Sequence, residues 1–130
     1  MGFTKGDVIE LFEATFRERV ALPDGLEDMW FDHALGGIEL ELGGIEYDPV
    51  TEEFGEKIGR PFLNAVAYLM KVYYCEREVS RVNKINNIIT KDVTLNGTGE
   101  TKRYAAADLE FAKERAADYM NKLKTSWFEN

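Results

Sequence analysis

Cysteine and histidine are almost absent from this chain of 130 residues, which contains one of each. A lone cysteine, Cys75, can form neither an intrachain disulfide nor a multi-cysteine metal site, and this usage indicates a reducing compartment such as the cytoplasm. The lone histidine, His33, has Trp30 three residues before it, so the Glu-x-x-His pair of carboxylate-bridged metal bundles is missing. We therefore expect no metal site and no cofactor.

Basic residues and long apolar runs are also scarce. Sixteen bases against 24 acids leave a net charge of -8, which disfavours nonspecific binding to DNA or to anionic lipid. No apolar run approaches the roughly 20 residues that a membrane-spanning helix needs, and the first residues lack the apolar stretch of a secretion signal. We expect a protein without a membrane anchor.

The charge is divided unequally along the chain. Residues 1–59 hold 15 acids and 4 bases, a net charge of -11, whereas residues 60–130 hold 9 acids and 12 bases, a net charge of +3. Two interpretations stay open. The halves could pack on each other inside a monomer, or unlike surfaces of neighbouring copies could meet head to tail and build rings or filaments.

The length fits a single domain, residues 1–130, and 45% apolar residues are enough to fill its core. Apolar residues three and four apart predict a helix from Thr4 to about Leu22, and a second helix that runs to about Leu42. Gly36 and Gly37 interrupt the second helix, so either another helix packs closely there or the helix bends; of the two we expect close packing.

The segment from Gly43 to Gly59 reads as an acidic connecting loop, although the sequence leaves open whether part of it is helical. Pro61 suits the first turn of a long helix, which we expect from Arg60 to Ile88. At 1.5 Å per residue this helix measures about 43 Å, whereas a compact globule of this length is roughly 36 Å across. Some of the helix must protrude or bend.

Alternating residues from Lys91 to Leu95, followed by the turn-forming pair Asn96-Gly97, predict a loop with β character. The final helix is expected from Thr101, with its apolar stripe at Tyr104, Leu109, Ala112, Ala116, Tyr119, Met120, Leu123 and Trp127. The fold class is therefore mainly α: a small bundle of about four helices with one long helix and an extended loop or hairpin before the last.

The run from Leu95 to Lys102 places two glycines and a lysine before a helix, as a phosphate-binding loop does. Glu100 and Thr101 separate the glycine from the lysine, however, and Glu100 puts negative charge where a phosphate would lie. We expect no nucleotide site. Without a convincing metal, phosphate or nucleophile motif, the chain is not expected to be an enzyme.

Two groups of side chains could serve a partner or simply the chain's own fold. The bases Arg77, Arg81 and Lys84 recur at helical spacing, which fits either a solvated face or a surface for an acidic partner. The aromatic residues fit either core filling or an interface, for which Tyr and Trp are favoured; they are Tyr68, Tyr73, Tyr74, Trp127 and Phe128.

The most distinctive stretch, residues 75–102, reads CEREVSRVNKINNIITKDVTLNGTGETK and is followed by an alanine-rich helix. With two short helices before it and a long helix entered at Arg60-Pro61, the chain resembles the small head-tail connector (neck adaptor) proteins of tailed bacteriophages and prophages. The resemblance implies a homo-oligomeric ring, typically dodecameric in the virion, between the portal and the tail-proximal neck proteins. DNA would pass through its bore, and the subunit, whether monomeric in isolation or not, would assemble in the host cytoplasm.

In this family the loop between the last two helices usually engages a neighbour or the portal. The resemblance therefore implies partner contacts at Asp92, Val93, Thr94, Leu95, Asn96, Gly97, Thr98 and Gly99, to which the basic and aromatic residues above add Arg77, Arg81 and Trp127.

A different class of function stays open. The -11 charge of residues 1–59 also fits a small acidic inhibitor or regulator that mimics DNA and binds a basic nucleic-acid-handling protein. Mimicry needs the acids in a double row along one exposed face, whereas an adaptor can scatter them.

Overall fold

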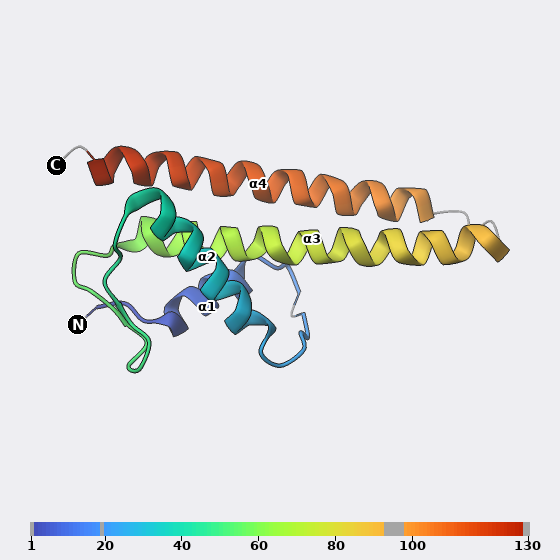
Figure 1. The fold of residues 1–130 in the computed structure, drawn as a ribbon. Helices are drawn as coiled ribbons and strands as arrows, with labels where there is room; N and C mark the ends of the chain where they lie inside the picture. Colours follow the sequence, from blue (N-terminus) through green and yellow to red (C-terminus); the bar gives the residue numbers. More distant parts are fainter. Residues whose placement is uncertain (1, 19, 93–97, 129–130) are drawn as a thin grey trace.

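A long antiparallel pair of helices carries a smaller lobe on one half of its length (Figure 1). The computed structural model describes residues 2–18, 20–92 and 98–128. In chain order its elements are α1 Lys5–Ala14, α2 Leu26–Leu42, β1 Tyr47–Asp48, β2 Glu53–Phe54, α3 Arg60–Asp92 and α4 Thr98–Phe128. The predicted mainly-α bundle is confirmed. We call residues 2–58, which contain α1, α2 and the β-hairpin, the N-terminal lobe.

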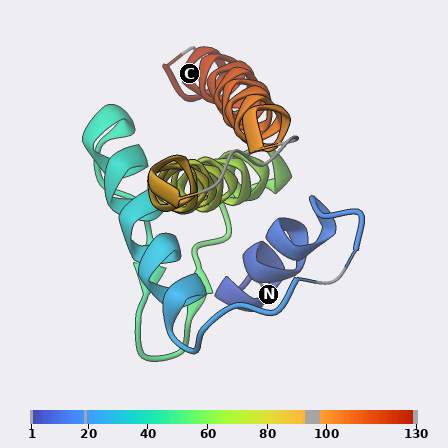
Figure 2. The same cartoon turned by 90° about the vertical axis from the view of Figure 1, so that its right-hand side faces the viewer.

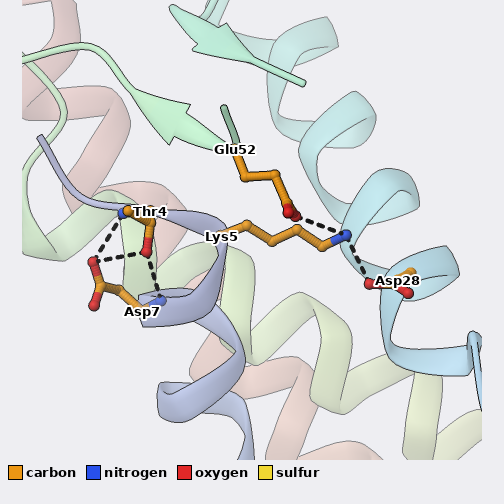
Figure 3. A network of polar contacts seen from close by, with 5 residues as sticks. All are labelled: Thr4, Lys5, Asp7, Asp28 and Glu52. Carbon is orange, nitrogen blue, oxygen red and sulfur yellow. Dashed lines mark hydrogen bonds and ion pairs between the residues drawn. The ribbon is translucent and has the colours of Figure 1, made fainter. Parts of the chain in front are cut away.

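The first helix is fixed at its N-terminal end by a capping box (Figure 3). The backbone N–H of Thr4 donates to Asp7 Oδ2 at 2.8 Å, and the N–H of Asp7 donates to Thr4 Oγ1 at 3.3 Å. The neighbouring Lys5 Nζ lies 2.7 Å from Asp28 Oδ1 of α2 and 3.5 Å from Glu52 Oε2 of the hairpin. One end of α1 is therefore tied to both other parts of the lobe.

The first helix is shorter than predicted, because it ends at Ala14 and not near Leu22. Thr15 ends it: its hydroxyl donates to the carbonyl of Phe12 at 2.6 Å. Phe16 then packs edge-on against Phe12, with ring centroids 5.2 Å apart, and against Tyr74, 4.8 Å apart. Phe16 therefore lies in a turn and is held there by aromatic contacts. The apolar spacing alone predicted that the helix would continue through it.

The second helix ends at Leu42 as predicted, and its buried stripe includes Trp30, Ala34 and Ile38. The expected close approach of another helix at the two glycines is wrong. A Cβ on Gly36 would meet nothing within 4 Å, and one on Gly37 would meet only the Tyr73 hydroxyl, at 4.0 Å. Gly36 is exposed and Gly37 is only partly buried, so no close helix contact requires a glycine at either position.

The segment between α2 and α3 is neither a plain loop nor a helix but a small antiparallel hairpin, in which Tyr47 pairs with Phe54. In its turn, Glu52 has a φ of 59° and donates its N–H to the Asp48 carbonyl at 2.7 Å. The buried Phe54 ring lies 6.1 Å from the ring of Phe31 in α2. The aromatic contact between Phe54 and Phe31 therefore anchors an otherwise acidic segment. Each strand has only two residues, which is too short for an alternating pattern to be detected in the sequence.

The main core lies where α1, α2 and the hairpin meet the first half of α3. Its largest fully buried side chains are Phe12, Phe31, Phe62, Ile38, Leu63, Met70, Val8 and Val66. A second, smaller cluster joins α3 to α4 and consists of Val72, Cys75, Ala112 and Ala116. Viewed along α3, the three helices α1, α2 and α4 lie around it (Figure 2).

Four of the five aromatic residues that the sequence left between core and interface are at least partly buried. Tyr68 stacks on Tyr119 with ring centroids 5.2 Å apart, and Tyr73, Tyr74 and Trp127 pack against the main core. Only Phe128 is mostly exposed, at 66%.

The long helix protrudes, as its length predicted. At 1.5 Å per residue the 33 residues of α3 span about 50 Å, and α1 and α2 cover only its first half (Figure 1). We call the uncovered part, residues 77–92 of α3 and 98–111 of α4, the arm.

The loop before the last helix is shorter than predicted. Lys91 and Asp92 belong to α3, and α4 begins at Thr98 instead of Thr101, so these residues have no β character. Residues 93–97, which include the Asn96-Gly97 pair, lie outside the described residues. At Lys91 and Asp92 the alternation is outweighed by the pairing of the two long helices, which extends α3 to Asp92.

Candidate interaction surfaces

The arm carries two of the predicted partner-contact residues close together. Arg81 Nη1 lies 2.8 Å from Glu78 Oε1, and Arg77 Nη1 lies 3.7 Å from the same oxygen. The Arg77 and Arg81 side chains are 36% and 55% exposed, and Lys84 is exposed one turn further along. Only two of the three bases, Arg77 and Arg81, pair with the Glu78 carboxylate, so this surface keeps a positive charge. We call Arg77, Arg81 and Lys84 the basic face of the arm.

The basic face continues the side of α3 that the N-terminal lobe covers. Met70 and Tyr74 lie two helical turns before Arg77 and Arg81 and therefore on the same side of the helix. Met70 is fully buried, and the Tyr74 ring lies 6.1 Å from that of Trp30 in α2. The lobe covers only the first half of α3, and the arm extends beyond it (Figure 1).

The third predicted residue outside the loop, Trp127, lies at the other end of the helical pair. It packs, half-buried, against the main core near the C-terminal end of α4 (Figure 1). The structure therefore does not bring it near Arg77 and Arg81. Of the predicted loop contacts, Asp92 ends α3, while Thr98 and Gly99 begin α4.

The outer face of α2 is a candidate that the sequence interpretation missed. Met29 is 47% exposed and Leu40 is 91% exposed, and Asp32, Gly36 and Glu39 between them are exposed as well. We call these five residues the outer face of α2. Met29 and Leu40 fall off the four-residue stripe of Trp30, Ala34 and Ile38, and this was the signal that could have identified them.

Tyr104 of α4 was also placed wrongly, on the buried stripe, although it is 67% exposed. The stripe passes through Ala105 and Leu109 instead, which are both partly buried, and Phe111 beyond them is 58% exposed. Tyr104 lies on the arm, where α4 has α3 as its neighbour but no lobe above it, so one side of the helix stays open to solvent.

The lobe retains most of its negative charge. Within the described residues, its acids form ion pairs at Asp28 and Glu52, both with Lys5, and at Glu41, with Lys124 of α4. Residues 1–59 contain 15 acids in all. The lobe therefore presents an acidic surface to any partner, and the outer face of α2 is part of it.

A surface hollow of about 720 Å³ lies between the end of α1 and the start of α2, with Phe12, Glu13 and Glu27 among its lining residues. Burial, and then the neighbouring Glu13 carboxylate, raise the pKa of Glu27 above its ordinary value. Glu27 Oε2 is buried and has no hydrogen-bond partner among the described residues. The carboxyl groups of Glu13 and Glu27 repel each other when both are ionised, so this pair is locally unfavourable.

The reactive residue types are explained by packing. Cys75 is 3% exposed between α3 and α4, and burial raises the pKa of its thiol, which disfavours the reactive thiolate. Lys71 Nζ lies 3.4 Å from the centroid of the Phe16 ring, and burial lowers the pKa of this lysine. His33 is exposed on α2, with its ring 6.2 Å from that of Tyr73.

Among the described residues, no helix has both the length and the hydropathy that a membrane span needs, and no three or more metal-ligating side chains gather in that part of the chain. Comparison of the sequence and structure with protein-family models, curated proteins and solved structures produced no match.

Proposed function

We propose that this protein is a structural subunit, a head-tail connector (neck adaptor) of a tailed bacteriophage or prophage. Its copies would form a ring between portal and tail, and DNA would pass through the ring. The observation that carries the proposal is a two-helix arm that extends past an acidic lobe and presents a basic face.

Two unlike surfaces on one chain favour a head-to-tail contact between copies. Such a contact is heterologous, and it closes into a ring when the rotation between successive copies allows. The arm supports this proposal because it can reach a neighbouring copy while the lobe keeps its own core. The overall charge of -8 suits a conduit, since a negative wall does not hold DNA.

The proposed role needs no reactive group, and the packing of Cys75 and Lys71 is consistent with it. The alternative of a DNA mimic gains no support from the described residues. The acids of the lobe are spread over α1, α2, the hairpin and the segments between them, whereas mimicry calls for a double row along one rod.

The proposal can be tested by co-sedimentation of the purified chain with the portal assembly of the same phage. We expect the chain to sediment with the portal, and electron microscopy of the complex to show an added ring. An unrelated acidic protein of similar mass serves as the control. A chain that stays monomeric at high concentration and does not sediment with the portal would refute the proposal.

A further inference from the structure

We propose that the basic face of the arm in one copy docks on the outer face of α2 in the next copy. The inference rests on the proposed function, because it names the surfaces through which successive subunits would meet. It joins the most basic described part of α3 to an exposed, acidic helix of the lobe.

The two faces match in spacing. The bases of the arm lie at positions 77, 81 and 84, and Asp32, Gly36 and Glu39 repeat the same steps of four and three residues. Seven residues of helix span about 10.5 Å, so two helices lying side by side would place an acid opposite a base at both ends. At the middle position, Gly36 leaves open space, into which the long side chain of Arg81 fits.

Apolar side chains border this pattern of charges. Met29 lies three residues before Asp32, and Leu40 directly follows Glu39; they are 47% and 91% exposed. Arginine and lysine carry apolar stems below their charged ends. Leu40 and Met29 would therefore cover those stems and lose water on docking, which adds a hydrophobic term to the ion pairs.

The contact has to form between two copies. The inner side of α2 packs against the lobe half of α3, which is the same continuous helix as the arm. The outer face of α2 therefore points away from its own arm (Figure 2). Because the two faces differ, each copy binds one neighbour through the basic face of its arm and another through the outer face of its α2. The contact therefore propagates from copy to copy.

The test is a charge exchange between two double variants. The first, Asp32→Lys with Glu39→Lys, makes the outer face of α2 basic. The second, Arg77→Glu with Lys84→Glu, makes the arm face acidic and keeps the 2.8 Å pair between Arg81 and Glu78. Each variant alone should fail to self-associate, with a weight-average mass near the 14.9 kDa of the monomer in light scattering. An equimolar mixture should assemble again, because opposite charges then meet at every contact.

The exchange is measured at about 50 mM and about 500 mM salt, and the higher concentration should weaken assembly of the unaltered chain. Arg103→Glu is the matched control, since Arg103 is an exposed base on α4 outside both faces. It should leave assembly unchanged. Circular dichroism melting of every variant shows that a loss of assembly is not a loss of fold.

Three outcomes would overturn the inference. If both double variants assemble like the unaltered chain, the contact lies elsewhere and the proposed function stands. If the mixture stays monomeric, the two faces do not meet each other. If the unaltered chain is monomeric throughout, the contact does not form between free copies, and co-sedimentation with the portal then decides separately whether the chain is a connector.

Discussion

The contact between α3 and α4 should be sensitive to any added volume at Ala116. This residue is 4% exposed and lies in the small cluster with Val72, Cys75 and Ala112. Small side chains let the two helices approach closely. Ala116→Leu would insert three more carbon atoms into a contact that has no space for them.

Overpacking of this kind costs about 1–3 kcal/mol in free energy of unfolding. For a domain of this length, 1 kcal/mol corresponds to a shift in Tm of about 3–5 °C. A central cost of about 2 kcal/mol therefore predicts a Tm lowered by about 6–10 °C in Ala116→Leu.

The neighbouring Ala117 provides the control, because it is exposed on the same helix. Ala117→Leu should change the free energy of unfolding by no more than about 0.5 kcal/mol. Both variants are compared by urea unfolding, followed by circular dichroism. Equal stability of the two variants would refute the packing argument, since it would mean that residue 116 has room for a larger side chain.

Two further variants test the lobe. Thr4→Ala removes the capping box with Asp7 and should lower the free energy of unfolding, measured by thermal unfolding, by about 1 kcal/mol. The control Thr51→Ala, in the exposed hairpin turn, should change it little. Equal losses of stability in the two variants would contradict the role of the cap. The raised pKa of Glu27 means that the folded chain holds this proton more tightly than the unfolded chain, so stability should fall as the pH rises from about 4.5 through the raised pKa. Glu27→Gln should remove that fall and stabilise the protein at pH 7 by about 1 kcal/mol, since its amide can donate to Glu13; an unchanged pH profile of Tm would exclude the pair.

The helices were predictable where the apolar spacing was long and regular. The end of α2 at Leu42 and the start of α3 at Arg60 follow from sequence alone, because stripe and flanking residues agree there. The end of α1 was not predictable in this way. Phe16 continues the apolar spacing, but its partner Tyr74 lies 58 residues further along the chain, and only the tertiary fold shows that contact.

The candidate surfaces were predictable only in part. Arg77 and Arg81 could be identified because helical spacing places bases on one side without knowledge of the fold. The outer face of α2 was missed, although Met29 and Leu40 fall off the buried stripe, because Gly36 looked like a place for close packing until the positions of α1 and α3 were known. Whether a glycine in a helix meets a neighbour or solvent depends on where the other helices lie, and one sequence does not contain that information.

The lobe and the arm share one unbroken helix, α3, so a rotation of the lobe moves the arm with it. The arm portion of α3, residues 77–92, is about 24 Å long, so a tilt of the lobe by about 10° would move the far end of the arm by about 4 Å. The other helix of the arm, α4, pairs with that portion of α3 and stiffens it against bending. A small rotation of the lobe would therefore appear at the far end of the arm as a displacement of about three quarters of a helical turn.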